Sequence, residues 1–567
     1  MKRIEKKAEL ENLRQRLQEQ RKPDQIRIRV CMTGCRARGA DRVAESFREL
    51  INKPGVKDRA VLVETGCHGF CAQAPVVVID PTGVFYGEVM PEDVPEIVKK
   101  TIVKGEIIDR LVYKDPQTGA AIPLAEDIPF YREQERSVLK NLGEIDPRRI
   151  EDYIERNGYS GLVRALTVMS PNSVINELEA SGLRGRGGAG FPTFLKWRLT
   201  RKEKSSQKYI ICNGDEGDPG AFMDRGVMEG DPHAVIEGMV IGGYAIGASQ
   251  GFIYVRAEYP IAVEHLSIAI DNARAMGLLG KNILGSGFDF DLQIREGAGA
   301  FVCGEETALM ASIEGKRGTP RSRPPYPSQA GLWGKPTSIN NAETFANVPI
   351  IIGQGADVYA GHGHGTSRGT KVFSLAGKLN NTGLVEVPMG ITLRELVFDL
   401  GGGMVSGKAF KAVQMGGPSG GCIPEKYLDL PVTYDSLAKI GAIMGSGGVI
   451  ALDEDTCMVY IAGYFLEFSA AESCGKCTPC RVGTTRMLEI LERIAAGRGS
   501  IDDIDKLVET AKTVKDASLC GLGQNAPNPV LSTIQYFRQE YIEHIETKRC
   551  PTGVCKRKLA AKAGQHG

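Results

Sequence analysis

The sequence has almost no net charge and no unbroken stretch of apolar residues. It contains 70 Lys and Arg against 69 Asp and Glu, which gives a formal net charge of +1. A nearly neutral chain has no general attraction to nucleic acid or to an anionic membrane surface, so we expect neither as a partner. The longest apolar stretch, residues 234–251, contains Glu237 and five glycines. Because a membrane-spanning helix needs about 18 or more apolar residues, we also expect no membrane span.

The N-terminal segment lacks the apolar core of a secretory signal. Residues 1–22, MKRIEKKAELENLRQRLQEQRK, are densely charged. We therefore expect a cytoplasmic protein. Disulfides are rare in the cytoplasm because thiols are kept reduced there. The 14 cysteines of this chain consequently indicate ligation of metal ions or iron–sulfur clusters.

The length and the order of the predicted elements indicate several domains. A chain of 567 residues is too long for one ordinary hydrophobic core. After a charged helix over about 2–20, strands over 26–30, 61–65, 76–80 and 84–89 and helices over 40–51 and 91–103 resemble a thioredoxin-like domain. Short strands around a helix over 393–400 make the segment 371–449 resemble a β-grasp domain.

Two pairs of cysteines each follow a predicted strand. Cys31 and Cys35 come after the first strand, and Cys67 and Cys71 come after the second, with glycines beside them. Four thiolates on neighbouring loops can bind a [2Fe-2S] cluster, as in small thioredoxin-like ferredoxins. Structural zinc accepts similar spacings and is the competing interpretation.

The second cysteine group is Cys474, Cys477 and Cys480, with Cys520 forty residues later. A CxxCxxC run with a distant fourth cysteine is typical of a [4Fe-4S] cluster. Zinc sites more often consist of separated CxxC pairs, so zinc is the weaker alternative. The helical pattern of this region predicts a helical domain around the cluster.

A glycine-rich segment, GRGGAGFPT over 185–193, has four glycines in six positions. Arg184, Arg186 and Lys196 flank it, so backbone N–H groups and cations could hold a phosphate. The preceding segment reads as a helix, which excludes a Rossmann dinucleotide fingerprint because that motif follows a strand.

Carboxylates and amides concentrate in three further segments. ICNGDEGDPG, over 211–220, supplies Asn213, Asp215, Glu216 and Asp218, which suit the hydroxyls of a ribityl or ribose chain. A calcium-binding EF-hand does not fit, because Gly217 would stand at a ligand position. GAGAFVCGEET over 297–307 adds Glu305 and Glu306, and NNAET over 340–344 adds amides and a hydroxyl. Taken singly, each segment is more often a polar turn than a site.

Together these segments resemble the flavin-bearing, NADH-oxidising subunit of respiratory complex I and its relatives, the beta subunits of soluble NAD-linked hydrogenases and formate dehydrogenases. GLRGRGGAGFPT, N-G-D-E-x-x-P-G, GEETAL, PRSRPPYP, GLWGKPT and INNAET occur in family order across about 130–545. The resemblance implies an FMN pocket with NADH stacked on the flavin, and a [4Fe-4S] cluster that takes electrons from the flavin first.

The resemblance also implies roles for individual residues. FMN would be held by Gly185, Arg186, Gly187, Lys196, Asn213, Asp215, Glu216, Gly304, Asn340, Asn341 and Thr344. Phe191, Asp218, Glu306 and Arg323 would lie toward NAD(H), with Asp218 and Glu306 as candidate catalytic residues, and Phe301 and Glu305 complete the cofactor-binding set. Phe301 stands where many relatives have Tyr, Asp218 where complex I has Glu, and Arg323 where many have Lys.

We predict a multidomain α/β and α+β protein. Its parts are a thioredoxin-like [2Fe-2S] domain (1–105), a linker (106–150), an FMN- and NADH-binding α/β domain (151–370), a β-grasp, SLBB-like domain (371–450), a helical [4Fe-4S] domain (451–545) and a C-terminal tail (546–567).

The implied function is that of the NADH-oxidising diaphorase subunit of a larger redox complex. The implied partners are a hydrogenase-like or formate-dehydrogenase-like catalytic subunit and a small thioredoxin-like [2Fe-2S] subunit, with ferredoxin reached through the complex. The same module in an acyl-CoA reductase complex or in complex I is an alternative, and electron bifurcation between NADH and ferredoxin stays open. A zinc-binding, nucleotide-regulated scaffold is the alternative from a different class.

The cysteines left after both clusters suggest a structural zinc site. Cys550 and Cys555 follow His544, and Cys457 is the unassigned cysteine nearest to that end of the chain. Three cysteines and one histidine are a common zinc ligand set. The alternative is that Cys550 and Cys555 are free thiols in a basic tail.

Overall fold

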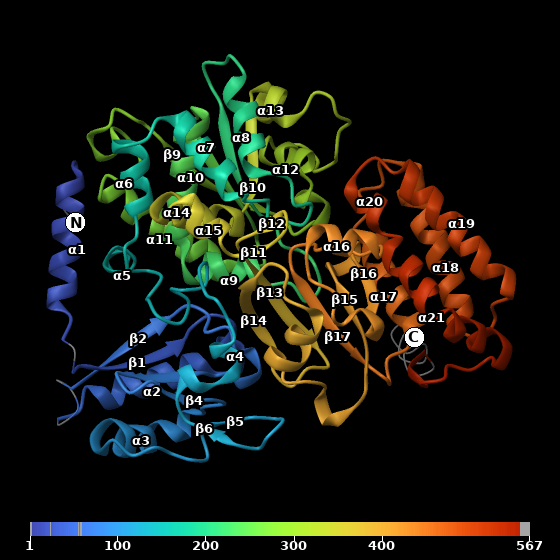
Figure 1. Cartoon of the computed structure of the whole chain (residues 1–567), viewed down its shortest axis with the longest axis horizontal. Coiled ribbons are helices and arrows are strands. Elements are labelled where there is room, and N and C mark those ends of the chain that lie inside the picture. The colour runs from blue at the N-terminus through green and yellow to red at the C-terminus, as the bar shows by residue number, and fades with distance from the viewer. Residues whose placement is uncertain (1–2, 23, 55, 57–58, 556–567) are drawn as a thin grey trace.

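The computed structural model describes residues 3–22, 24–54, 56 and 59–555 (Figure 1). The final part of the predicted tail, 556–567, lies outside the described residues. Among the described residues, no helix is both long and apolar enough to cross a membrane.

The N-terminal domain is a four-stranded sheet in the order β2-β1-β3-β4. It consists of β1 (Ile26–Cys31), β2 (Ala60–Thr65), β3 (Val77–Asp80) and β4 (Val84–Tyr86), with α2 (Ala40–Ile51) and α3 (Val94–Ile97), which continues as a π-helical turn over 98–102. Strands β1 and β2 are parallel, and β3 pairs antiparallel with both β1 and β4. The thioredoxin-like fold is therefore confirmed.

Helix α1 (Lys7–Gln20) forms as predicted but packs away from this sheet. Leu10 is buried in the core of the following α/β domain. Arg14 donates hydrogen bonds to the carbonyls of Ile154 and Gly158. The first helix thus joins the second structural unit, although we grouped it with the first.

The α/β domain is built on a parallel sheet in the order β10-β7-β8-β9. The strands are β7 (Tyr209–Gly214), β8 (Gln250–Arg256), β9 (Asp291–Gly297) and β10 (Thr337–Asn341), with the central helices α10 (Pro232–Ile246), α11 (Pro260–Ala275) and α14 (Ala342–Gln354). Helix α10 is buried almost all round, which explains the apolar stretch 234–251 as a core helix.

The β-grasp domain is a five-stranded sheet in the order β14-β13-β17-β15-β16. Its elements are β13 (Thr370–Gly377), β14 (Gly383–Pro388), a π-helical segment (Glu395–Leu400), β15 (Phe410–Met415), β16 (Gly421–Pro424), α16 (Tyr434–Lys439) and β17 (Gly448–Asp453). In Figure 1 it lies between the α/β domain and the C-terminal helices.

The C-terminal domain is helical, as predicted. It contains α17 (Met458–Ala471), α18 (Thr484–Ala495), α19 (Ile501–Ala517), α20 (Gly521–Asn525) and α21 (Asn528–Thr547). Helix α19 starts with a capping box between Ser500 and Asp503, which satisfies N–H groups that a helix start leaves unpaired. Leu491 and Ile494 of α18 and Leu507 of α19 belong to the hydrophobic core of this domain.

The segment predicted as a linker is folded onto its neighbours. The Glu386 carboxylate on β14 accepts hydrogen bonds from the backbone N–H groups of Ser137, Val138 and Leu139. Phe130 lies in the β-grasp core. The exact domain boundaries stay predictions.

The other α-helices and short strands either pack against the α/β domain or join the domains. They are β5 (Tyr113–Lys114), β6 (Ala121–Ile122), α4 (Pro129–Arg132), α5 (Ile150–Glu155), α6 (Ser160–Thr167), α7 (Pro171–Ser181), α8 (Thr193–Lys202), α9 (Met223–Gly230), α12 (Glu306–Ile313), α13 (Pro327–Ala330), α15 (Ala356–Ala360), β11 (Gly363–His364) and β12 (Ser367–Arg368).

Candidate active site and metal centres

A cleft of about 660 Å³ opens beside the carboxyl ends of β7 and β10. Open parallel sheets bind ligands at this edge, because the loops that follow the strands converge there. The predicted residues that line the cleft are Gly187, Asn213, Asp215, Glu216, Asp218, Phe301, Gly304, Glu305 and Asn341.

The glycine-rich loop between α7 and α8 forms one wall of the cleft. Gly190 has φ +62°, and a Cβ atom there would lie 2.7 Å from the ring of Tyr434. Gly188 has φ +129° and would place a Cβ atom 3.3 Å from the backbone of Gly445. Glycine is required at these positions because larger residues would be strained and would displace the β-grasp domain.

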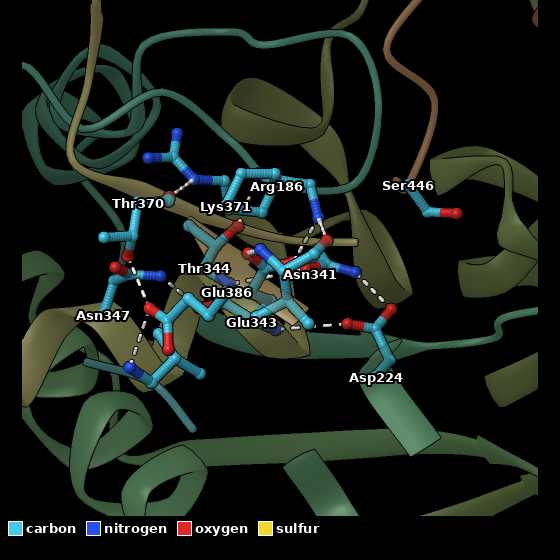
Figure 2. Close-up of polar contacts among 12 residues, drawn as sticks. Arg186, Asp224, Asn341, Glu343, Thr344, Asn347, Thr370, Lys371, Glu386 and Ser446 are labelled. Atoms are coloured by element: carbon cyan, nitrogen blue, oxygen red, sulfur yellow. Dashed lines mark hydrogen bonds and ion pairs between the residues drawn. The ribbon is translucent and has the colours of Figure 1, made fainter. Parts of the chain in front are cut away.

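Arg186 supports this loop from behind, where the sequence predicts a phosphate contact. Its guanidinium is fully buried and donates to the carbonyls of Thr370 and Arg368 and to the hydroxyl of Tyr359. Its backbone N–H donates to the Thr344 hydroxyl, at 2.8 Å. These donors are already used inside the protein, so the side chain is not available to a phosphate in the cleft. Figure 2 shows the contact with Thr370.

Three other predicted residues also lie outside the cleft lining. Gly185 accepts a hydrogen bond on its carbonyl from the Tyr434 hydroxyl, at 2.8 Å. The Asn340 side-chain oxygen accepts one from the indole of Trp197, at 2.9 Å. Together with Thr344, these residues fix the walls of the cleft through internal contacts.

Two buried carboxylates in the cleft have oxygens without a partner in the described part of the chain. Both side-chain oxygens of Asp215 and one of Asp218 are buried and unpartnered. The other Asp218 oxygen accepts a hydrogen bond from Ser446, at 3.1 Å. Burial raises the pKa of each carboxyl to about 7. Ligand hydroxyls are donors that would satisfy these acceptors, so the donor set fits a ribityl or ribose chain.

Glu216 and Asn213 hold the loop that carries these carboxylates. The Glu216 side chain accepts hydrogen bonds from the backbone N–H groups of Asp224 and Arg225 at the start of α9. Asn213 donates to the carbonyl of Gly304 and accepts from the N–H of Asp215. The oxygens of Glu216 therefore cap a helix, although the sequence suggested recognition of a hydroxyl group.

A second predicted group forms around Glu306, outside the cleft lining. The Glu306 carboxylate lies 2.6 Å from the Arg323 guanidinium and 3.5 Å from the Lys196 ammonium. Lys196 also lies 5.9 Å from the ring centroid of Phe191, which is 43% exposed. Neighbouring Glu305 accepts from the N–H groups of Thr307 and Ala308 and thereby caps α12.

Several lining residues carry no sequence motif and were not predicted. They are Asp224, Gly416, Ser419, Tyr434, Asp435, Ala442, Met444, Ser446, Gly521, Leu522 and Asn525, whereas Arg184, which the sequence did single out beside the glycine loop, also lines the cleft. Most belong to the β-grasp domain, to which the sequence assigned no chemistry. Only tertiary packing brings them to the cleft, and no local spacing signals it.

The second cysteine group lines one small cavity. Cys474, Cys477, Cys480 and Cys520 surround it together with Val302 and Leu522. The last two residues also line the cleft. Four convergent thiols suit a [4Fe-4S] cluster, and the shared residues place it directly behind the cleft.

The N-terminal cysteines converge as well. The thiol of Cys31 contacts those of Cys35 and Cys67, and the thiol of Cys67 contacts that of Cys71. The backbone N–H of Gly69 donates to the sulfur of Cys67, at 3.2 Å. This donor set fits a [2Fe-2S] cluster with nearby backbone donors.

The remaining predicted ligands form a third group. The ligand atoms of Cys457, His544, Cys550 and Cys555 all lie within 4.8 Å of one another. Cys457 Sγ is 3.6 Å from Cys555 Sγ, and each of these two sulfurs is 3.5 Å from His544 Nε2. His544 Nδ1 faces the carbonyl of Glu540, at 2.7 Å, which directs Nε2 toward the sulfurs.

A cleft with hydroxyl-binding carboxylates beside a four-cysteine cavity defines a redox protein that couples a nucleotide-type cofactor to an iron–sulfur cluster. The sequence matches three family descriptions. Residues 178–350 match the Nuo51 FMN-binding domain, residues 460–544 match the NADH-ubiquinone oxidoreductase-F iron-sulfur binding region, and residues 17–102 match the thioredoxin-like [2Fe-2S] ferredoxin.

Individual relatives agree with these matches. The chain is 58% identical over 424 residues to the NADP-reducing hydrogenase subunit HndC of Solidesulfovibrio fructosivorans, covering 75% of this chain and 86% of that relative. It is 43% identical over 397 residues to one of the NADH-quinone oxidoreductase subunits of Escherichia coli (strain K12), covering 70% and 89%. A crystal structure of an NAD+-reducing [NiFe]-hydrogenase in the H2-reduced state aligns with a TM-score of 0.65 and 29% identity, covering 100% of this chain and 97% of that chain.

The chain belongs to the family of flavin-bearing, NADH-oxidising subunits found in NADH-quinone oxidoreductases and in related hydrogenases. It is an NADH dehydrogenase subunit with FMN, [2Fe-2S] and [4Fe-4S] domains. The predicted family, fold class and activity are confirmed, and the [2Fe-2S] interpretation holds over zinc for the N-terminal domain.

Proposed function

We propose that this subunit oxidises NADH in a soluble complex whose catalytic partner is a hydrogenase. The similarity to a hydrogenase subunit over 86% of its length supports this partner. A formate-dehydrogenase-like subunit is the alternative, and a small thioredoxin-like [2Fe-2S] subunit would complete the complex. None of the 14 cysteines, all of which lie in the described residues, forms a disulfide, which suits a cytoplasmic location.

In this proposal the cleft residues hold FMN. The loop around Gly187 would accommodate the phosphate, since its backbone approaches the cleft without side chains. Asp215 would accept hydrogen bonds from ribityl hydroxyls, and Asn341 would orient the ring. Arg186, Asn340 and Thr344 would hold the walls in place. Bound FMN would supply the conversion between two-electron and one-electron transfer, and the clusters would relay single electrons.

The residues around Glu306 would receive NADH. Glu306 already pairs with both Lys196 and Arg323, so these cations are not free for an additional phosphate. This pairing favours NAD(H) over NADP(H), because NADP carries an extra 2′-phosphate. Asp218 lies in the cleft and would adjoin the nicotinamide side. The Solidesulfovibrio relative is named NADP-reducing, so NADP(H) is the second candidate.

The observation that carries the proposal is that Val302 and Leu522 line both the cleft and the four-cysteine cavity. These two side chains would exclude water between donor and acceptor sites and keep them adjacent. The Cys474, Cys477, Cys480 and Cys520 thiolates would hold the electron acceptor there.

The nucleotide is tested by anaerobic titration of purified protein with NADH and, separately, with NADPH, followed at the flavin absorbance. An iron assay and the visible spectrum establish that flavin and clusters are present. We expect NADH to bleach the flavin stoichiometrically and NADPH to do so much more slowly. Equally fast reduction by NADPH would contradict the proposed preference.

We also propose a structural zinc ion at Cys457, His544, Cys550 and Cys555. Tetrahedral zinc with Zn–S bonds of about 2.3 Å and Zn–N bonds of about 2.0 Å separates its ligands by roughly 3.5–3.8 Å. The distances of 3.5 and 3.6 Å among Cys457, Cys555 and His544 fit this geometry. The ion would fasten the end of α21 to the start of α17.

A further inference from the structure

A group of buried charges lies in the wall of the proposed flavin cleft and behind it. Glu216, Asp224, Glu343 and Lys371 are each 5% exposed or less, and they come from different segments of the chain. Figure 2 shows Asp224, Glu343 and Lys371. Glu343 lies in the NNAET segment, whereas no sequence motif marks Asp224 or Lys371. Burying charges is costly unless they are paired, so the way in which these four groups pair decides their charge states.

Lys371 is committed to one of the three carboxylates. Its ammonium lies 2.6 Å from Glu343 Oε2 and also donates to the carbonyl of Val372. The other Glu343 oxygen accepts from the N–H of Val372, at 2.9 Å. Lys371 and Glu343 therefore bind each other and the backbone of Val372.

Asp224 joins this pair to the cleft. One of its carboxylate oxygens accepts from the backbone N–H of Glu343, at 3.2 Å, and the other accepts from the side-chain amide of Asn341 (Figure 2). Both Asp224 and Asn341 line the cleft. Within the described residues, no cationic side chain forms an ion pair with Asp224.

The group therefore has an excess of acid. Three carboxyls face a single ammonium, and full ionisation would leave uncompensated charge in a buried place. Burial, reinforced by Glu216 and Glu343, raises the pKa of Asp224. The titratable or charged side chains that face Asp224 from neighbouring elements are Cys212, Glu216, Tyr259, Glu343 and Lys371.

We propose that Asp224 is a positioning residue that links proton uptake behind the cleft to the electron affinity of the flavin held there. This inference rests on the proposed function. Hydride donation by NADH brings two electrons and one proton into the cleft, which adds one negative charge. Uptake of one proton from bulk solvent by the Asp224 carboxylate would supply the second proton and cancel that charge. Asn341, hydrogen-bonded to Asp224, would transmit the change to the ring.

The test is the flavin midpoint potential of the purified protein, measured against pH by anaerobic spectroelectrochemistry. In the wild-type protein, the midpoint potential should fall as pH rises. Over the pH range where Asp224 titrates, the fall should be steeper by an additional slope, which corresponds to one extra proton taken up per two electrons. In Asp224→Asn this additional slope should be absent. Asp231→Asn, which alters a buried carboxyl hydrogen-bonded to Asn141, should keep it.

The same slope in wild type and Asp224→Asn would overturn the proposal, because a merely structural role would change flavin content without changing the slope. If Asp224→Asn does not fold, Lys371→Gln serves instead. Lys371 is the only cation of this group among the described residues, so its loss should raise the pKa of Asp224. The pH range with the additional slope should then move to higher pH, and an unchanged range would contradict the proposal. Wild-type protein that binds no flavin would refute the proposed function itself.

Discussion

Val302 and Leu522 each line both the proposed flavin cleft and the cavity of the four cysteines. Val302 follows β9 in the α/β domain, and Leu522 lies on α20, two residues after Cys520. The α/β domain and the C-terminal domain therefore meet here. Each contributes one residue to the wall between the two proposed cofactor sites. This relationship supports the proposal that electrons leave the flavin first through the C-terminal cluster.

Gly190→Ala should lower the flavin content of the purified protein. The new Cβ atom would lie 2.7 Å from the Tyr434 ring at a φ of +62°, so the glycine loop would have to move. Gly185→Ala is the matched control, because its Cβ atom would lie 3.5 Å from the nearest atom. Flavin released by acid and quantified by fluorescence measures the effect, and equal content in both variants would contradict it.

Glu306→Gln should weaken NADH oxidation while FMN stays bound. Loss of a charge-assisted hydrogen bond costs about 1.5–3 kcal/mol, which corresponds to roughly a 10- to 150-fold lower kcat/KM for NADH. Steady-state reduction of an artificial dye measures this value, and the flavin spectrum checks occupancy. Glu296→Gln, an exposed carboxylate, is the control. Unchanged kcat/KM in Glu306→Gln would remove this residue from the NADH site.

Asp218 should make the stability of the flavin-free protein depend on pH. Burial raises its pKa to about 7, whereas in the unfolded chain it titrates near about 4. Asp218 therefore does not reduce the free energy of unfolding below about pH 4. The free energy of unfolding then decreases progressively as pH rises from about 4 to about 7.

Asp218→Asn removes this loss, so its free energy of unfolding should rise relative to wild type across that range. The expected gain is on the order of 2–4 kcal/mol. Chemical denaturation at several pH values measures it. Asp271→Asn, whose side chain is 77% exposed, should show no such trend. A difference between Asp218→Asn and wild type that does not vary with pH would refute the assignment.

Zinc should be present near one equivalent per chain, beside the iron of the clusters. Cys555→Ser should lower the zinc content with little loss of iron, because it removes one ligand from the group with Cys457 and His544. Cys422→Ser, a buried cysteine outside this group, is the control. Metal analysis by mass spectrometry gives both contents. Wild-type protein with full iron and no zinc would exclude the site.

Local patterns predicted much of the fold and the grouping of the cysteines. The CxxCxxC run and the alternation of strand and helix depend on near neighbours, which the sequence displays directly. The glycine loop was also visible, but the direction of the Arg186 side chain was not. That direction depends on Thr370 and Tyr359, which are far away in sequence.

The residues that sequence reasoning missed reach the site through packing between domains. Tyr434 and Ser446 come from the β-grasp domain, and Asp224 comes from a helix without a recognised motif. Leu522 follows a cluster cysteine, yet its contact with the cleft depends on how two domains meet. Periodicity reports which face of an element is apolar, but it does not name the partner surface.

Stopped-flow mixing of anaerobic Cys480→Ser protein with NADH tests the central claim most directly. Flavin reduction should occur at the wild-type rate, because hydride transfer precedes the cluster, whereas reduction of the [4Fe-4S] centre and electron delivery to the partner should be lost. Cys422→Ser should retain both phases. Loss of flavin reduction in folded, flavin-loaded Cys480→Ser, or undiminished electron delivery, would contradict the path from the cleft past Val302 and Leu522 to the C-terminal cluster.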